Sequence, residues 1–160
     1  MSMQKNMKES YDLLVDLYTV DFSKKNIDVS IKRALSPNAD KIIDFVAKNF
    51  NVSWASEIKP ALYKTHPTCY VAVIDKQIVG FACYDATAKG FFGPTGVLEE
   101  HRKKGIGTAL LMHCLEAMLY DGYSYAIIGA VRGALDFYKN KCNAIPIENS
   151  KNVYKRLIER

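Results

Sequence analysis

Residues 93–120 read GPTGVLEEHRKKGIGTALLMHCLEAMLY, and this stretch decides how the rest of the chain is interpreted. A short apolar strand leads into a basic turn that contains Gly105 and Gly107, and a long apolar helix follows with Thr108 in its first turn. The first N–H groups of a helix lack partners and carry the positive end of its dipole, so a glycine-rich approach suits an anion such as a pyrophosphate. Glycines before helices commonly do no more than turn the chain, but the order strand, Arg-x-x-Gly-x-Gly and apolar helix is much more specific.

Two familiar phosphate-binding loops do not fit this stretch. It has no Gly-x-x-x-x-Gly-Lys-Ser/Thr sequence, and Leu110 stands where the dinucleotide fingerprint Gly-x-Gly-x-x-Gly has its third glycine. The stretch instead resembles the acetyl-CoA loop of the GNAT superfamily of N-acetyltransferases, in which a strand ending in Val-x-Pro-x-x-Arg is followed by a Gly-x-Gly/Ala turn that opens a helix. Val97 and Arg102 match that pattern, and Glu99 takes the place of the proline.

The resemblance extends to a second motif and implies a set of ligand-binding residues. The run ALDFYKNKCNA, residues 134–144, resembles the last GNAT motif through Phe137 and Tyr138, with Asn143 where members usually have glycine. The asparagine that many members carry before this helix is missing. From the first motif, the resemblance implies that acetyl-CoA contacts Val97, Leu98, Arg102, Lys103, Lys104, Gly105, Ile106, Gly107 and Thr108.

The composition favours one domain over residues 1–160, with residues 1–26 as an N-terminal helix or arm before the core. The chain is 49% hydrophobic, and its 22 basic and 17 acidic residues give a net charge of +5, which favours anionic ligands but is also ordinary. No apolar run approaches the ~20 residues of a membrane span, and the first residues lack the apolar core of a signal peptide, so we expect a cytoplasmic protein. Four scattered cysteines without a Cys-x-x-Cys pair predict reduced core residues, with no metal site and no disulfide.

Hydrophobic periodicity and turn residues predict a mixed α+β chain. We expect helices at residues 6–19, 36–50, 53–63, 105–120 and 134–141, and strands at 27–34, 68–75, 77–87, 93–98, 124–131, 144–147 and 152–158. Asp75 and Lys76 turn a hairpin, and Pro94 and Gly96 interrupt the strand at 93–98. Together with the resemblance, this predicts a GNAT-like α/β fold: a mixed central sheet of about six to seven strands with flanking helices, and a splayed pair of parallel strands that forms the acetyl-CoA cleft.

The chemistry that the resemblance implies is acyl transfer from a thioester to an amine. No cysteine is flanked by a histidine and no serine lies in a nucleophile elbow, so direct attack by the amine is the simplest mechanism. An N–H of Val97 or Leu98 could stabilise the developing oxyanion, and Tyr138 is the candidate acid that protonates the departing thiolate. A tyrosine in this position is more often a core residue, so its role depends on the family match.

The sequence defines the acceptor side less sharply. We expect four residues to lie near the acceptor pocket: Trp54, Glu57, Tyr84 and Asp85. An amine arrives protonated and needs a base, for which the acidic candidates are Glu57, Asp85, Glu99 and Glu100. Acidic residues around a basic turn are usually surface charges, so no base is assigned. The three histidines, His66, His101 and His113, show no ligand spacing.

Three functions compete on these grounds. The leading one is an acetyl-CoA-dependent N-acetyltransferase, with acetyl-CoA and an amine as partners and a homodimer left open. The second is a non-catalytic acyl-CoA-binding regulator, which turnover on any amine would exclude. The third is a nucleic-acid-binding module that uses Arg102, Lys103 and Lys104; it is the weakest, because these basic residues cluster in one loop without an extended stripe or a recognised motif. We therefore expect neither nucleic acid nor a membrane as partner.

Overall fold

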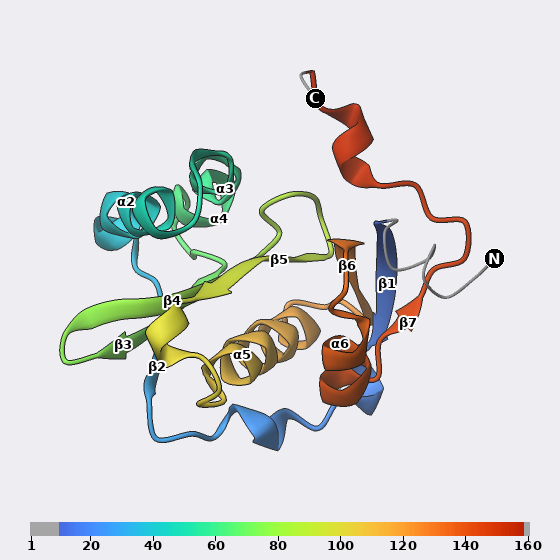
Figure 1. The fold of residues 1–160 in the computed structure, drawn as a ribbon, viewed down its shortest axis with the longest axis horizontal. Helices are drawn as coiled ribbons and strands as arrows, with labels where there is room; N and C mark the ends of the chain where they lie inside the picture. Colours follow the sequence, from blue (N-terminus) through green and yellow to red (C-terminus); the bar gives the residue numbers. More distant parts are fainter. Residues whose placement is uncertain (1–9, 159–160) are drawn as a thin grey trace.

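The computed structural model describes residues 10–158, which form a seven-stranded mixed sheet with helices on both faces (Figure 1). The strands are β1 (Tyr11–Asp16), β2 (Ser30–Arg33), β3 (Cys69–Ile74), β4 (Gln77–Tyr84), β5 (Phe91–Val97), β6 (Tyr125–Val131) and β7 (Ile145–Pro146), in the order β2-β3-β4-β5-β6-β1-β7. The α-helices are α2 (Ala39–Asn49), α3 (Val52–Glu57), α4 (Lys59–Leu62), α5 (Ile106–Tyr120) and α6 (Leu135–Cys142). Short 3-10 helices are η1 (Leu17–Thr19), η2 (Phe22–Lys25), η3 (Ser36–Asn38), η4 (Glu99–His101) and η5 (Val153–Arg156). The expected fold class is confirmed.

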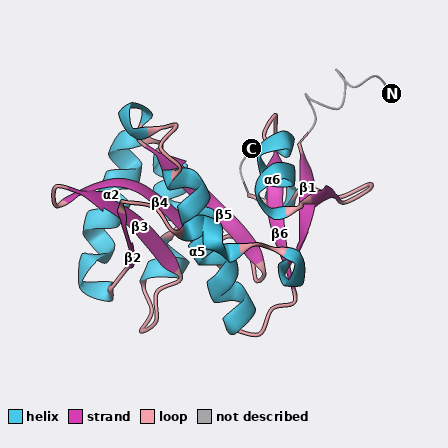
Figure 2. Ribbon diagram, turned by 90° about the horizontal axis from the view of Figure 1, so that it is seen from below, coloured by secondary structure: helices cyan, strands magenta, loops and turns pink. Residues whose placement is uncertain are grey.

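Two apolar clusters hold the layers together, one on each face of the sheet. Helix α5 lies across β4 and β5 on one face, and α2, α3 and α4 cover the other (Figures 1 and 2). Because successive side chains of a strand point to opposite faces, Phe81 and Cys83 of β4 pack under α2–α4, whereas Ala82 and Tyr84 pack toward α5. Helix α5 is buried along most of its length, as its apolar sequence predicts.

The hairpin between β3 and β4 turns at the residues that the sequence indicates. Asp75 and Lys76 have φ of 51° and 65°, and Ile74 pairs with Gln77. Two consecutive residues with positive φ are characteristic of the turn that matches the twist of a two-residue hairpin. This turn places β4 beside β5 and so begins the half of the sheet that carries the site.

Strand β5 joins the two halves of the sheet. It pairs with β4 antiparallel, and the register shifts between Ala82 and Tyr84, opposite the segment that contains Gly93 and Pro94. It pairs with β6 in parallel through only two residues, Phe91 with Ile127 and Phe92 with Ile128. The rest of β5 has no pairing on that side, so the predicted interruption and the splayed parallel pair are both present.

The expected N-terminal helix at residues 6–19 is wrong where the structure describes it; residues 6–9 lie outside the described part. Tyr11–Asp16 is strand β1, which pairs antiparallel with β6 and with β7. Leu13 and Leu17 fit a helical spacing, but Leu13, Val15 and Leu17 also alternate, and all three are fully buried. The alternating pattern prevails because β6 offers an open edge to which an apolar strand can add.

The expected last strand at residues 152–158 is also wrong. This segment contains η5, whose first turn is capped by the Asn152 side chain accepting from the Tyr154 N–H at 2.8 Å. The Asn152 amide also donates to Ser10 Oγ at 2.8 Å, which ties the segment to the start of β1. The predicted helix at 53–63 divides into α3 and α4, with Pro60 in the first turn of α4. Within residues 10–158, no helix is long and apolar enough to cross a membrane.

Candidate active site

The basic loop before α5 presents unpaired backbone donors. Gly105 is the N-cap residue of α5, with φ of 79°, a left-handed conformation that glycine adopts without strain. No side chain caps the helix, and within residues 10–158 the N–H groups of Ile106, Gly107 and Thr108 have no acceptor. Ala109 is the first residue of the helix whose N–H is paired, to Gly105 O at 3.0 Å. This donor set fits a phosphate or pyrophosphate group.

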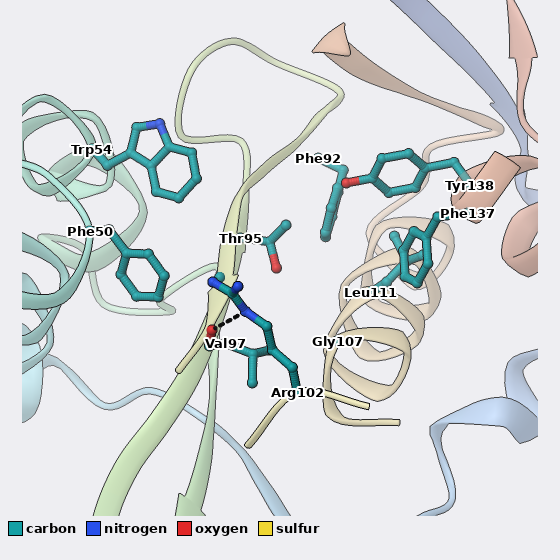
Figure 3. A pocket seen from close by; sticks show the side chains of 11 residues that line it. Phe50, Trp54, Phe92, Thr95, Val97, Arg102, Gly107, Leu111, Phe137 and Tyr138 are labelled. Atoms are coloured by element: carbon teal, nitrogen blue, oxygen red, sulfur yellow. Dashed lines mark hydrogen bonds between the residues drawn. The ribbon is translucent and has the colours of Figure 1, made fainter. Parts of the chain in front are cut away.

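Three basic side chains surround these donors. Arg102, Lys103 and Lys104 are all exposed. The Arg102 Nε donates to Val97 O at 3.2 Å, which holds the loop against the end of β5 (Figure 3). Lys104 Nζ lies 3.2 Å from His101 Nδ1. The loop therefore combines exposed positive charge with free helix N–H groups, and both favour an anionic ligand.

A pocket of about 320 Å³ opens next to this loop. Figure 3 shows its walls: Phe50 and Trp54 on one side, Thr95 and Val97 of β5 in the middle, and Leu111, Phe137 and Tyr138 on the other. Gly107 also lines it, and its missing side chain leaves room in front of α5. The pocket thus runs from the anion-binding donors toward the splayed part of the sheet.

The aromatic wall of this pocket explains one of the glycines. A Cβ at Gly96 would lie 2.5 Å from Phe50 Cε1, far inside any real contact, so Phe50 packs directly on the strand. A glycine within a strand lets another group approach the backbone closely, and at Gly96 that group is the Phe50 ring. Phe50 also contacts Trp54 and Phe81 with ring centroids 5.8 and 5.4 Å apart, which fixes its position.

Only one of the two expected oxyanion donors is available. The Leu98 N–H donates to Val79 O at 2.8 Å and is therefore used by the sheet. In an antiparallel pair alternate residues face the partner strand, so the Val97 N–H and C=O point the other way, toward the gap between β5 and β6. The bond from Arg102 to Val97 O is consistent with that direction. The pairing with β6 stops at Phe92, so no strand covers Val97 on this side.

Tyr138 lies where the pocket meets a second, larger cleft. Its ring packs edge-on against Phe92, with centroids 6.4 Å apart, and against Phe137 at 5.1 Å (Figure 3). The hydroxyl has no hydrogen-bond partner within residues 10–158, yet it is not sealed in the interior, so it is open to the pocket. Burial of the ring raises the pKa of Tyr138 to about 12, which keeps the phenol protonated at neutral pH.

The second cleft has a volume of about 1260 Å³. Its walls are α3, the connection from β4 to β5, the end of β6 and the C-terminal segment around η5. It shares four residues with the first pocket: Trp54, Phe92, Thr95 and Tyr138. The two spaces therefore meet beside the Tyr138 hydroxyl, so a donor in one can reach an acceptor in the other.

Glu57 is held inside the larger cleft by two hydroxyl groups. Its Oε2 accepts from Tyr154 at 2.6 Å and from the hydroxyl of Thr87. Three elements that are distant in the sequence, α3, the β4–β5 connection and η5, meet at this one carboxylate. Burial of the ring and, to a smaller extent, the hydrogen bond to Glu57 raise the pKa of Tyr154 to about 12. Glu57 and Trp54, two of the residues expected near an acceptor, both line this cleft.

Tyr84 and Asp85 line neither space. Tyr84 is fully buried and donates to Asp121 Oδ2 at 2.6 Å, and burial raises its pKa well above the usual value. Asp85 Oδ1 accepts from the Gly90 N–H at 2.8 Å and from Tyr123 at 2.9 Å, and so shapes the β4–β5 connection. Both residues are expected near the acceptor, but the structure brings neither of them into the two clefts, because their side chains are bonded inside the fold.

Other titratable residues have structural or surface positions. Glu99 and Glu100 are exposed on η4. His113 stacks on Tyr70, with ring centroids 5.2 Å apart, and burial lowers its pKa. The four cysteines are free and buried, as expected. The residues that the structure describes contain no group of three or more metal-ligating side chains.

Comparison with known proteins now identifies the class. The family model described as Acetyltransferase (GNAT) family matches residues 35–143, which is more than half of the chain. The chain therefore belongs to the GNAT family of acetyltransferases. That match includes the basic loop, α5, α6 and the splayed strand pair. No curated protein sequence matches the chain.

Solved structures agree on the fold and differ in what they act on. The chain is similar to a glucosamine N-acetyltransferase region of a fungal multi-domain GH3 β-N-acetylglucosaminidase, with a TM-score of 0.69 and 15% identity over 86% of this chain and 20% of that one. A GCN5-related N-acetyltransferase from Kribbella flavida is similar with a TM-score of 0.64 and 16% identity, over 87% of this chain and 55% of that one. A ribosomal-protein-alanine N-acetyltransferase from Brucella melitensis biovar Abortus 2308 is similar with a TM-score of 0.55 and 20% identity, over 77% of this chain and 95% of that one. The chain thus spans a fifth of the first and about half of the second, and at these identities the likeness shows the fold alone.

Proposed function

We propose that this protein transfers an acetyl group from acetyl-CoA to an amine by direct attack. The observation that carries the proposal is the continuity of the site: free N–H groups at the start of α5 open onto a pocket that joins a second cleft beside Tyr138. Such an arrangement suits two ligands that must meet, one of them anionic. A binding protein for a single ligand would not need the second cleft.

Binding of the cosubstrate follows from the donor set at the start of α5. The N–H groups of Ile106, Gly107 and Thr108 would hold the pyrophosphate, with Arg102, Lys103 and Lys104 supplying positive charge around it. The apolar pocket between β5 and α6 would take the arm that leads to the thioester. Acetyl-CoA supplies an activated acyl group there.

Two groups of this chain would then assist the transfer. The Val97 N–H faces the gap between β5 and β6 and can donate to the carbonyl oxygen as negative charge develops on it, a contribution of several kcal/mol in other enzymes. The Tyr138 hydroxyl, which stays protonated because its pKa is about 12, can give a proton to the departing thiolate. At that pKa the transfer is uphill for a thiol of ordinary pKa, about 8.5, so Tyr138 needs close contact with the sulfur to act.

Titration of acetyl-CoA and a thiol-release assay over a panel of primary amines test the proposal together. Binding with release of free thiol that depends on the amine supports transfer. Tight binding of acetyl-CoA without turnover on any amine would instead support a non-catalytic acyl-CoA-binding protein. Stronger and strongly salt-dependent binding of nucleic acid in place of CoA would favour the nucleic-acid module.

A further inference from the structure

The larger cleft has an unequal distribution of charge. Among its described lining residues, Glu57 is the only acidic side chain, and Arg132 and Arg156 are the only basic ones. Glu57 belongs to α3, whereas the arginines come from the connection after β6 and from η5. In Figure 1 α3 and the end of β6 lie on opposite sides of β5, and η5 reaches α3 through the hydrogen bond from Tyr154 to Glu57. The cleft therefore contains one acidic side chain, which η5 contacts through Tyr154, and two basic side chains, one of them from η5 itself.

Glu57 is preorganised, and no basic side chain within residues 10–158 is bonded to it. Both groups that donate to its Oε2, the hydroxyls of Tyr154 and Thr87, are uncharged. Its Oε1 has no partner within residues 10–158. The one salt bridge in the part of the chain that the structure describes joins Lys25 to Glu116, far from the cleft in the sequence. A carboxylate fixed in this way can bind an ammonium group without first reorganising.

The two arginines are equally unused. Arg132 and Arg156 are exposed, and neither side chain makes a hydrogen bond or a salt bridge to any residue between 10 and 158. Arginine presents a planar set of donors that matches a carboxylate or a phosphate. A ligand that carried only positive charge would meet one favourable and two unfavourable charges in this cleft, which argues against a polyamine or an aminoglycoside-like acceptor.

We propose that the acceptor is an amine that also carries an acidic group, a carboxylate or a phosphate. Glu57 binds the ammonium end, and Arg132 and Arg156 bind the acidic end. The inference rests on the proposed acetyl transfer and narrows its acceptor to one class. It also gives Glu57 a definite role, which is to position the amine; the sequence alone assigns it none.

Matched probes separate this proposal from its alternatives. We would compare ω-amino carboxylates of increasing length with the corresponding carboxamides, with ω-diamines of the same length, and with ω-aminoalkyl phosphates, using thiol release from acetyl-CoA. For the best length, kcat/KM for the acid should exceed that for the amide by on the order of tenfold or more, because a charge-assisted hydrogen bond is lost in the amide. The better of the two acidic series identifies the group that the arginines recognise.

Variants assign the preference to the cleft. In Arg132→Gln and Arg156→Gln, the ratio of kcat/KM for the acid to kcat/KM for the amide should fall toward one, mainly because KM for the acid rises. Lys155→Gln is the matched control, since Lys155 is the exposed cation next to Arg156 that does not line the cleft, and its ratio should stay that of the parent. Glu57→Gln should raise KM for acid and amide alike, because both carry the ammonium group.

The possible failures are distinguishable. If amides or diamines are acetylated as well as the acids, this proposal is wrong while acetyl transfer stands. If the acid is preferred but Lys155→Gln reduces the preference as much as the cleft variants do, the preference comes from overall charge and the assignment is wrong. If acetyl-CoA binds and no probe of any class releases thiol, the proposed function fails and this inference fails with it.

Discussion

Replacing Gly107 with alanine should separate the needs of the fold from those of the site. A Cβ at this position would lie 3.8 Å from Val97 Cγ2, an ordinary van der Waals contact, and no other atom would be closer. Alanine is favoured over glycine inside a helix by up to about 1 kcal/mol, so the variant should unfold at an equal or higher urea concentration than the parent. Nothing in the fold therefore requires glycine here.

Whereas the stability of the fold should stay equal or rise, the affinity for acetyl-CoA should fall. The added methyl group stands in front of the free N–H groups at the start of α5 and keeps phosphate oxygens away from them. A hydrogen bond to a charged group contributes about 1.5–3 kcal/mol, so the loss of one such bond should weaken acetyl-CoA binding roughly 10- to 150-fold. Gly107→Val should weaken it further, because its branches fill more of the same space.

Calorimetric titration with acetyl-CoA and urea unfolding of the same preparations provide the test. Gly105→Ala is the contrasting variant: with φ of 79° at this position, alanine should cost about 1–2 kcal/mol of stability. If Gly107→Ala is as stable as the parent and binds acetyl-CoA equally tightly, the start of α5 does not hold the pyrophosphate, and the site must be sought elsewhere.

Four further substitutions test other parts of the site. Tyr138→Phe should lower kcat by roughly 10²–10⁴-fold with little change in KM for acetyl-CoA if the hydroxyl is the acid, and a rate within about twofold of the parent would transfer that role to water. Since the pKa of Tyr138 is about 12, ionisation of this group should not lower the parent's rate below about pH 11. A fall in rate near pH 10 that disappears in Tyr138→Phe would show that the pKa is not raised in the working enzyme. Tyr154→Phe removes a hydrogen-bond donor to Glu57, so it should lower the free energy of unfolding by about 1 kcal/mol and raise KM for the acceptor. A change confined to acetyl-CoA binding would contradict the assignment of the two clefts to two different ligands. Gly96→Ala should destabilise the fold by about 1–3 kcal/mol through the Phe50 ring, and Phe50→Leu should relieve most of that cost; strictly additive effects would place the strain elsewhere.

Local chemistry accounts for the parts of the fold that could be predicted from the sequence. The Asp75–Lys76 turn, the interruption at Pro94 and the left-handed Asn143 at the end of α6 each depend on a few neighbouring residues, and each is found at the expected place. The N-terminal strand could not be predicted in this way. Leu13 and Leu17 suit a helix and a strand equally, and only the distant edge of β6 decides between them.

The same limit applies to the site. The basic loop was predicted because its residues are consecutive, whereas Glu57 meets a tyrosine 97 residues away, and no local pattern could have paired them. Phe50 and Phe92, which form much of the pocket wall, are apolar residues outside any motif. Tyr84 and Asp85 line neither cleft because their polar groups find partners within the fold, Asp121 for one and Tyr123 for the other. Sequence position alone cannot distinguish a side chain used for packing from one that faces a ligand.

The order of strands in the sheet has a consequence for how the chain can fold during synthesis. Strands β2 to β5 come from residues 30–97 and can pair with one another as soon as that part of the chain has emerged. Among the seven described strands β1 is made before the others, yet both of its neighbours, β6 and β7, are made after all the rest. Its apolar residues Leu13 and Val15 must wait, without a partner strand, until more than a hundred further residues have been added. Strand β1 is therefore synthesised before β2 to β5 but enters the sheet after them, and its apolar segment stays unpaired while the intervening chain is made.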